Sequence, residues 1–359
     1  MSSLSDRFGG GWRLCVRRGC LGIGAALVFL AGGAAWAAKP VAMVAADGSG
    51  QFKTVQAAVD SASESGLVIR IAPGLYREKL HIAQNGIELI GTGKKPEDVV
   101  LTYDDSAKSA GGTGKSGSVN VSGDDFKAEN LTIQNDWEKK NARLGEGSQA
   151  VALMLTGDRE VLRHVRLLGY QDTLYAASKT CHGAADQAAA EASGLPCHAS
   201  RQLFEDCYIE GHVDYIFGDA KAVFNRCELH GMTHTIVTIT AQSKLYPLED
   251  SGYLFLHCTI TGDAAVDKLS FGRPWRPYSK VYFVDTIMKG SVLDPPGWME
   301  WAGKLTTSDY AEYNTREADG KPVSVDKRIA PSRQLTKAEA EKLTAVTWLT
   351  GPDGWNPDK

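Results

Sequence analysis

The sequence predicts an all-β fold in which the chain coils into a stacked parallel β-helix. A short alternating apolar pattern recurs along the chain, a glycine follows most copies at a constant offset, and the copies lie roughly twenty to forty residues apart. Alternation with a period of two marks strands with one buried face, and irregular spacing suits a solenoid whose turns carry loops of different length. The copies are Glu129–Ile133, Arg163–Leu167, Glu205–Ile209, Asn225–Leu229, Leu256–Ile260 and the weaker Val284–Met288.

The remaining elements follow from local patterns. Apolar residues at helical spacing in Phe52–Asp60 predict a short helix that caps the N-terminal end of the solenoid. Val68–Ile71 and Ile87–Ile90 begin the strands, and the Gly- and Ser-rich segment 106–117 predicts a loop. The C-terminal segment 335–355 predicts a short amphipathic helix and a Trp-rich tail packed on the coil.

One position of each repeat should point inward and form a ladder through the stacked coils. Three of these positions are cysteines, Cys207, Cys227 and Cys258, which we interpret as small core hydrophobes rather than as a metal site. The whole ladder is Leu131, Val165, Cys207, Cys227, Cys258 and Thr286.

Residues 1–37 predict a secretory signal peptide. Four arginines precede a long apolar run, which ends in a small-residue cleavage site at Ala37. We expect a secreted or periplasmic protein, cleaved near Ala37, whose residues 38–359 form one domain. An uncleaved membrane anchor, a twin-arginine signal at residues 17–18 and a lipid attached to Cys20 are the alternatives.

Charge and hydropathy narrow the classes of partner. Without residues 1–37, which hold four arginines and one aspartate, the formal net charge changes from −4 to −7. A mildly acidic chain argues against nucleic acid as a partner. After the leader, no segment is long and apolar enough to span a bilayer.

Two further cysteines, Cys181 and Cys197, bracket an insert of small residues. In an exported protein this arrangement predicts a disulfide. Zinc binding by these cysteines with His182 or His198 is the rival interpretation, and the lack of a close Cys pair argues against it.

Asp172 and Asp214 lie at equivalent distances from two of the repeats, seven residues after Val165 and Cys207 respectively. Adjacent coils are spaced like neighbouring strands, about 4.8 Å apart. The two carboxyl groups should therefore lie about 5 Å apart, too close for both to ionise independently. One protonated and one ionised carboxyl group suit an acid and a nucleophile.

Five segments occur in a characteristic order: Gly74–Glu78, Gln149–Leu153, Gly169–Tyr175, Asp214–Gly218 and Gly272–Trp275. Together they resemble the motifs of the pectin methylesterases, or pectinesterases, and the resemblance runs from about Val44 to Trp355. It implies a right-handed single-stranded parallel β-helix that hydrolyses the methyl esters of polygalacturonate to pectate and methanol. It implies neither a metal nor a cofactor, and we expect a monomer that binds methyl-esterified homogalacturonan.

The resemblance implies a role for each matching residue. Asp214 would attack the ester carbonyl to form an acyl-enzyme, and Asp172 would act first as the acid and then as the base. Gln149 and Gln171 would donate hydrogen bonds to the oxyanion. Arg273 would pair with Asp214 and keep it ionised.

Substrate binding is predicted from the aromatic residues near the motifs. Trp275 would face a sugar ring, Tyr170, Tyr215 and Phe217 would line a groove, and Trp298 with Met299 would form a wall, whereas His212 is a weaker candidate for the site lining.

Three other features bear on binding. The chain has Met154 where the family usually has Arg, and the insert at about 176–200 should project beside the cleft. Because the chain is acidic, binding of a polyanion would rely on local basic residues such as Arg201 and Arg273.

Three other functions stay open. An esterase or thioesterase on the same scaffold could act on a different acyl group, the solenoid could bind polysaccharide without catalysis, or it could be a pectate lyase. The chain has no Gly-x-Ser-x-Gly elbow and no His-Glu-x-x-His segment, the signatures of common serine esterases and zinc hydrolases.

Overall fold

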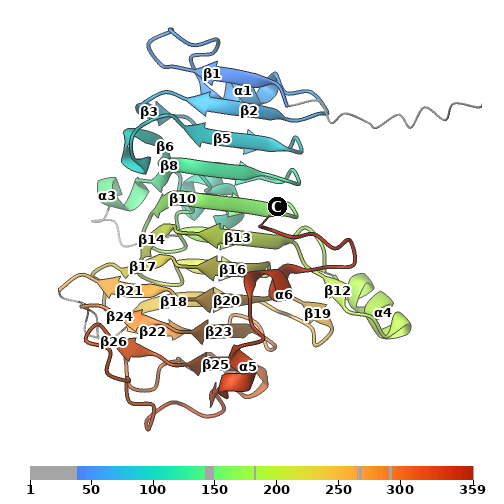
Figure 1. Ribbon diagram of the computed structural model, residues 1–359, viewed down its shortest axis with the longest axis vertical. Helices are drawn as coiled ribbons and strands as arrows, with labels where there is room; N and C mark the ends of the chain where they lie inside the picture. Colours follow the sequence, from blue (N-terminus) through green and yellow to red (C-terminus); the bar gives the residue numbers. More distant parts are fainter. Residues whose placement is uncertain are drawn as a thin grey trace, which may run out of the picture. The chain divides into compact units, whose positions relative to one another are not determined.

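The computed structural model describes residues 39–141, 149–181, 183–264, 266, 269–290 and 293–358. The expected signal peptide lies outside this set, as does His182. From Lys39 onward the chain forms one compact unit, in which the strands stack as successive coils (Figure 1). Within the described residues, no helix has both the length and the apolar character needed to cross a membrane.

The coils build three faces of parallel strands. The first face contains β1 (Val41–Val44), β2 (Leu67–Ile71), β5 (Ile87–Gly91), β8 (Lys127–Asn135), β10 (Glu160–Leu168), β13 (Arg201–Glu205), β16 (Lys221–Asn225), β20 (Gly252–Leu256), β23 (Lys280–Val284), β25 (Asp309–Tyr313) and β27 (Arg333–Gln334). The second contains β3 (Gly74–Arg77), β6 (Val99–Tyr103), the later parts of β8 and β10, β14 (Tyr208–Gly211), β17 (Glu228–Gly231), β21 (Thr259–Gly262), β24 (Ile287–Met288) and β26 (Arg316–Glu317). The third contains β4 (Leu80–Ile82), β7 (Val119–Val121), β9 (Leu153–Leu155), β11 (Leu174–Ala176), β15 (Ile216–Gly218), β18 (Val237–Gln242) and β22 (Leu269–Gly272).

The prediction of a parallel β-helix is confirmed, and the repeats account for its shape. One residue of each repeat adopts the left-handed conformation, with φ between 51° and 56°, directly before the inward ladder position. Asn, Asp and His tolerate this conformation better than most residues, and it turns the chain from the first face to the second in one step. The residues are Asn130, His164, Asp206, Arg226, His257, Asp285 and Asn314.

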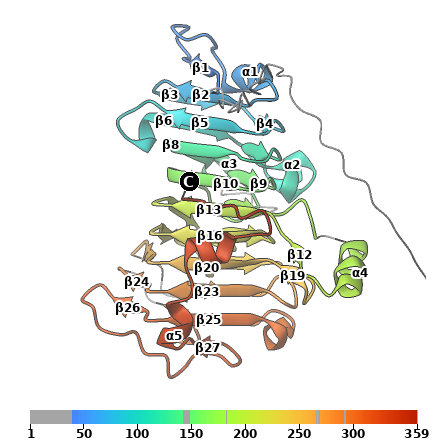
Figure 2. The ribbon, with the colours of Figure 1, turned by 45° about the vertical axis from the view of Figure 1, so that its right-hand side comes forward.

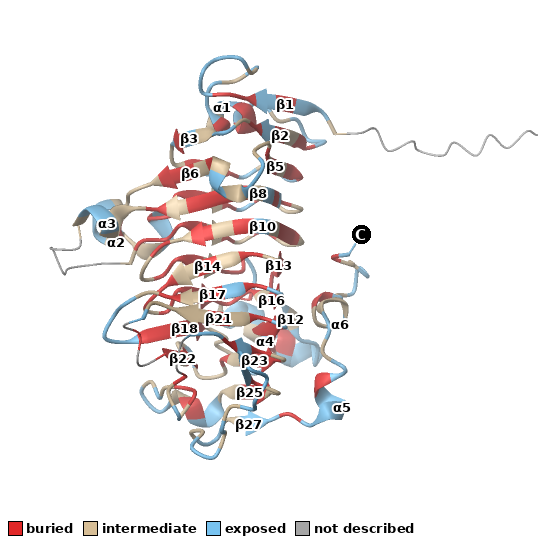
Figure 3. Ribbon diagram, turned by 60° about the vertical axis from the view of Figure 1, so that its left-hand side comes forward, coloured by how far each residue is buried: buried red, intermediate tan, exposed pale blue. Residues whose placement is uncertain are grey.

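Equivalent side chains stack in the interior, and buried residues recur along the strands of successive coils (Figure 3). The rings of Phe204, Phe224, Phe255 and Phe283 stack with centroids 4.2 to 4.6 Å apart. Every member of the predicted inward ladder is at most 2% exposed. Its three cysteines carry free thiols and are core residues.

The ends of the coil are covered largely as predicted. The capping helix is α1 (Val55–Asp60), which begins after Thr54 because the Thr54 hydroxyl accepts a hydrogen bond from the N–H of Ala57.

The expected loop at 106–117 contains two short turns, α2 (Ala107–Ala110) and the 3₁₀ turn η2 (Thr113–Lys115). Two other short elements, η1 (Pro96–Asp98) and α3 (Trp137–Asn141), lie in the connections between strands.

The C-terminal tail packs on the outer side of the first face, with two short helices where the sequence predicts one. Both α5 (Lys337–Ala340) and α6 (Ala345–Leu349) begin at a threonine whose hydroxyl accepts a backbone hydrogen bond. Leu335 and Leu349 are buried in the same apolar cluster as side chains of β13 and β16.

The Cys-bracketed insert forms α4 (Ala184–Ser193) and β12 (Cys197–His198), and Cys181 and Cys197 form a disulfide. Strand β12 pairs with β19 (Glu249–Asp250), which belongs to the connection after β18. Figure 2 shows α4 projecting from the column of coils. The insert is therefore held at both ends, by a covalent bond and by a strand ladder.

Glu160 is fully buried at the start of β10, and neither carboxylate oxygen has a hydrogen-bond partner of ordinary geometry among the described residues. Burial raises the pKa of Glu160 well above its ordinary value, and the charges of Asp124 and Asp158 raise it further. Gln202, its register partner on the next coil, also has a buried side-chain oxygen without a partner.

We predict that Glu160→Gln stabilises the protein at neutral pH by about 1–3 kcal/mol. An amide does not ionise, and its N–H group can donate to the side-chain oxygen of Gln202, which has no partner among the described residues of the wild type. The wild-type carboxyl group contributes full stability below its unfolded pKa of about 4.3 and loses it as the pH rises toward the raised folded pKa. Urea unfolding at acid and neutral pH measures this difference, with the exposed Glu64→Gln as control. A gain that is equal at both pH values would contradict the account.

Candidate active site

Asp172 and Asp214 occupy the same point on adjacent coils. Each lies two residues before a strand of the third face, and these strands pair with Leu174 opposite Ile216. The Asp172 N–H donates to the carbonyl of Val213 at 3.1 Å, which links the two turns directly. Both aspartates have positive φ, 63° and 53°, so each turns the chain onto the third face.

A cavity of about 510 Å³ opens on the outer side of the third face, around these two aspartates. Its residues come from six successive coils and from the α2–η2 segment, which forms one wall. The residues are Thr113, Gly114, Gln149, Met154, Gln171, Asp172, Tyr175, Asp214, Phe217, Ala241, Arg273, Trp275 and Trp301.

Strand register sets the floor of this cavity. Met154, Tyr175, Phe217 and Ala241 are register partners on β9, β11, β15 and β18, so they form one outward row across the coils. The rings of Tyr175 and Phe217 stack with centroids 4.2 Å apart. The floor is therefore largely apolar, with two aromatic rings stacked side by side on adjacent coils.

Arg273 follows β22 and reaches back over the small side chain of Ala241 to Asp214. Its Nε lies 2.9 Å from Oδ1 and its Nη2 2.7 Å from Oδ2 of Asp214, a bidentate pair. The guanidinium carbon also lies 4.2 Å from the centroid of the Trp301 ring. Two contacts thus fix the plane of the guanidinium group.

The carboxyl groups of Asp172 and Asp214 lie in different electrostatic environments. Burial raises the pKa of Asp172 well above its ordinary value, the Asp214 charge raises it further, and Arg273 opposes both through its charge. Burial also raises the pKa of Asp214, but there Arg273 opposes it through a hydrogen bond as well as its charge. Asp172 therefore holds a proton over a pH range in which Asp214 is ionised.

Gln149 and Gln171 lie beside the aspartates on the wall formed by earlier coils. Gln171 immediately precedes Asp172, and its carbonyl accepts a hydrogen bond from Ala150 at 3.2 Å. The carbonyl of Gln149 accepts one from the N–H of Ala107, the first residue of α2. Both backbones are held by the coil, and both residues line the cavity.

Two of the predicted binding residues lie in the core instead. Trp298 is 2% exposed and its ring stacks on Tyr310, because its strand bridge to Gly272 turns the side chain inward. Tyr215 is fully buried, since the left-handed turn at Asp214 places the following side chain inside. Neither can contact a ligand in the cavity.

Three other candidates also lie away from the cavity lining. Tyr170 is partly buried with its ring 6.0 Å from that of His212, and Met299 is partly buried and is not among the lining residues. His212 is buried, with its Nε2 2.9 Å from the carboxylate of Glu138. The strand patterns that surround these residues do not place them on the third face.

The structure adds lining residues that the motif analysis missed. Tyr175 is the last residue of the motif Gly169–Tyr175. Its alternation with the buried Leu174 could have shown that the Tyr175 side chain points outward. Trp301 lies three residues after Trp298, and only the bridge of Trp298 to Gly272 decides which of the two reaches the cavity. Met154, which stands where the family usually has Arg, lies on the floor of the cavity.

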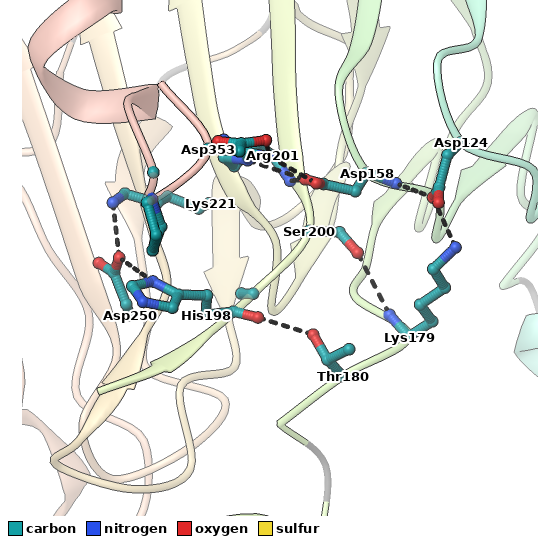
Figure 4. Close-up of a pocket in the computed structure, with 13 residues that line it drawn as sticks. Asp124, Asp158, Lys179, Thr180, His198, Ser200, Arg201, Lys221, Asp250 and Asp353 are labelled. Carbon is teal, nitrogen blue, oxygen red and sulfur yellow. Dashed lines mark hydrogen bonds and ion pairs between the residues drawn. The ribbon is translucent and has the colours of Figure 1, made fainter. Parts of the chain in front are cut away.

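A second cavity of about 330 Å³ lies between the insert, the first-face corner and the tail (Figure 4). Arg201 binds Asp158 and Asp353 there, at 2.6 and 2.7 Å, so it is saturated and cannot serve the first cavity. None of the described residues 176–200 lines the first cavity, whereas His198 and its neighbours line the second. The insert is thus not a wall of the predicted cleft.

A β-helix that presents two carboxyl groups of unlike pKa and an ion-paired arginine above an apolar floor has the site of an acid–base hydrolase. The described residues hold no group of three or more His, Cys, Asp or Glu side chains placed to bind a metal ion.

Comparison with known proteins identifies the family. The sequence model of the Pectinesterase family matches residues 41–182 and 187–352. Pectinesterase 31 of Arabidopsis thaliana is 34% identical over 310 residues, which cover 83% of this chain and 88% of that protein.

Solved structures agree. Pectin methylesterase from carrot matches with a TM-score of 0.73 and 28% identity, covering 88% of this chain and 94% of that one. A pectin methylesterase in complex with a hexasaccharide matches with a TM-score of 0.69 and 28% identity, covering 89% and 99%. The chain belongs to the pectinesterase family and is a carboxylic ester hydrolase.

We predict that Arg273→Gln lowers the free energy of unfolding by about 3 kcal/mol at neutral pH, because it leaves the buried Asp214 carboxylate without its partner. Without Arg273 the pKa of Asp214 rises further, so the loss should shrink as acid protonates this carboxyl group. Urea unfolding at neutral and acid pH tests this, with the exposed Arg70→Gln as control. A loss that does not depend on pH would show that Arg273 acts mainly by packing.

Proposed function

We propose that the protein hydrolyses methyl esters of pectin, with Asp214 as the nucleophile and Asp172 as the acid and base. One observation carries the assignment: Arg273 binds Asp214 bidentately, whereas it affects Asp172 only through its charge. An ionised nucleophile and a protonated acid then stand side by side in one cavity.

In the first half of the proposed reaction, a carboxylate oxygen of Asp214 attacks the ester carbonyl carbon. The carbonyl electrons move onto its oxygen, and Gln149 and Gln171, which line the same cavity, are placed to donate hydrogen bonds to this oxyanion. When the intermediate collapses, the bond to the methoxy oxygen breaks. Asp172 gives its proton to this oxygen, and methanol leaves.

In the second half, the acyl group is held on Asp214 as an anhydride. Asp172, now a carboxylate, takes a proton from a water molecule as that water attacks the acyl carbon. Collapse of the second tetrahedral intermediate breaks the bond to Asp214. The product leaves as a carboxylic acid that gives its proton to solvent, Asp214 is again an anion beside Arg273, and Asp172 again carries its proton.

The shape of the cavity supports a sugar substrate. Phe217 and Tyr175 form a stacked floor, and Trp275 approaches Phe217 edge-on with ring centroids 5.9 Å apart. Aromatic faces of this kind pack against the C–H groups of a sugar ring. The hexasaccharide complex of a pectin methylesterase provides an independent precedent in a structure similar to this chain.

We further propose that residues 1–37 direct export and are cleaved near Ala37, leaving residues 38–359 as a single mature domain. The Cys181–Cys197 disulfide supports an oxidising compartment. We also propose a monomer, because one chain supplies every lining residue of the cavity.

We predict that Asp214→Asn and Asp172→Asn each reduce methanol release from highly methylated pectin by a factor of about 1,000 or more, because each removes a group that forms or breaks a bond. Circular dichroism and thermal unfolding establish that each variant is folded. The isosteric Asp219→Asn, which alters a carboxyl group of the next turn outside the cavity lining, is the control. Near-normal turnover in a folded Asp214 variant would refute the assignment.

The same assay separates the alternatives. Turnover of a short acyl ester or thioester, without methanol release from pectin, would favour a different acyl substrate. Pectin binding without turnover in the wild type, retained in Asp214→Ala, would favour a non-catalytic solenoid. Ultraviolet absorbance from an unsaturated sugar product would reveal a lyase.

We predict a bell-shaped dependence of kcat/KM on pH. Acid should lower the rate by protonating Asp214, and alkali should lower it by deprotonating Asp172, whose pKa burial raises well above the ordinary aspartate value. Both limbs should therefore lie at higher pH than free aspartate would give. A rate that rises steadily through neutral pH would contradict the role of Asp172 as an acid.

A further inference from the structure

We propose that His212 is a positioning residue for the two catalytic aspartates, through a hydrogen bond that its imidazole accepts from the backbone of the turn carrying Asp214. This inference rests on the roles proposed for Asp172 and Asp214, and it extends the site to a residue outside the cavity lining. His212 precedes Asp214 by two residues and belongs to the turn between β14 and β15.

The two ring nitrogens of His212 have different partners. Nδ1 lies 2.7 Å from the backbone nitrogen of Val213, which can only donate, so Nδ1 accepts this hydrogen bond. Nε2 then carries the proton of the ring and donates it to the carboxylate of Glu138 in α3, at 2.9 Å. Glu138 therefore selects the tautomer that the turn requires.

The imidazole is enclosed by neighbouring turns. His212 is 3% exposed, and its ring stacks on that of His234, in the connection between β17 and β18, with centroids 4.3 Å apart. The ring of Tyr170, in the turn that carries Asp172, lies 6.0 Å away. The hydrogen bond between His212 and Val213 is thus largely shielded from water, which strengthens it.

This hydrogen bond completes a set around the two peptide groups that precede Asp214. The carbonyl of His212 accepts from the N–H of Thr238 in β18, at 2.7 Å. The carbonyl of Val213 accepts from the N–H of Asp172 on the preceding coil, at 3.1 Å. The N–H of Val213 donates to the imidazole. Together these bonds orient both peptide groups and hold Asp214 at a φ of 53°, a conformation that few residues other than glycine adopt.

The position of Val213 affects both catalytic residues. A shift of its backbone would move the carboxylate of Asp214 relative to Arg273 and would weaken the hydrogen bond from Asp172. A displacement of about 1 Å between reacting groups can lower a rate about 100-fold. The aromatic floor is built on other residues, so loss of this hydrogen bond should lower turnover more than substrate affinity.

The test uses two amide variants that separate the functions of the two ring nitrogens. Asn places its side-chain oxygen where Nδ1 lies, so His212→Asn keeps the acceptor for Val213. Gln places its amide nitrogen near the position of Nε2, so His212→Gln keeps only the donor to Glu138.

Methanol release from highly methylated pectin is the assay. We expect kcat to fall about tenfold or more in His212→Gln and to stay within about threefold of the wild-type value in His212→Asn. KM should change by less than about twofold in both variants, because the residues of the floor are unaltered.

The matched control is the same pair of substitutions at His230 in β17. His230 also uses both ring nitrogens, with Nδ1 2.8 Å from the hydroxyl of Thr261 and Nε2 3.2 Å from the carboxylate of Asp263, but it lies outside the turn of Asp214. Both His230 variants should keep the wild-type kcat. Circular dichroism and thermal unfolding establish that each variant is folded.

A measurement on the wild type does not depend on how the variants fold. In ¹⁵N spectra of histidine-labelled protein, the His212 signal, assigned by its loss in His212→Asn, should show a protonated Nε2 and an unprotonated Nδ1 at the pH of the assay. This pattern is the tautomer that the bond to Val213 requires.

A protonated Nδ1, equal kcat values in the two His212 variants, or an equal loss in the His230 variants would overturn the inference, while methanol release by the wild type left the proposed function intact. Absence of methanol release by the wild type would refute the proposed function and this inference together.

Discussion

The register between adjacent coils is the constraint on which the rest of the structure depends. Parallel hydrogen bonding sets Leu153, Leu174 and Ile216 opposite one another, and every outward side chain on the third face takes its height from that pairing. A slip of one residue would reverse the faces of a strand and replace Phe217 with a buried neighbour. The catalytic carboxyl groups, the aromatic floor and the reach of Arg273 over Ala241 all follow from this one alignment.

The alignment also produces an electrostatic asymmetry from two residues of identical chemistry. Asp172 and Asp214 occupy equivalent turns, and both are largely buried. A single arginine, two coils further along, reaches one of them and not the other with hydrogen bonds. Repetition supplies the pair of acids, and the departure from repetition at Arg273 gives each a different protonation state.

Sequence patterns were sufficient wherever a side chain's direction follows from strand alternation. The inward ladder, the adjacent aspartates and the outward Phe217 are of this kind. They failed where a turn or an isolated bridge sets direction, as for Tyr215 after a left-handed residue and Trp298 opposite Gly272. Arg201 could not be excluded from the sequence, because its partner Asp353 lies in a distant tail.

The stacked thiols of Cys207, Cys227 and Cys258 have a consequence for how the protein is made. If residues 1–37 direct export, as proposed above, the chain meets oxidants while it is still unfolded, and the five cysteines after residue 37 then compete for pairing. In the folded state, Cys181 and Cys197 are joined and the other three are sealed inside the coil. For an exported chain, correct pairing would therefore require the coils to stack before an oxidant reaches the three thiols.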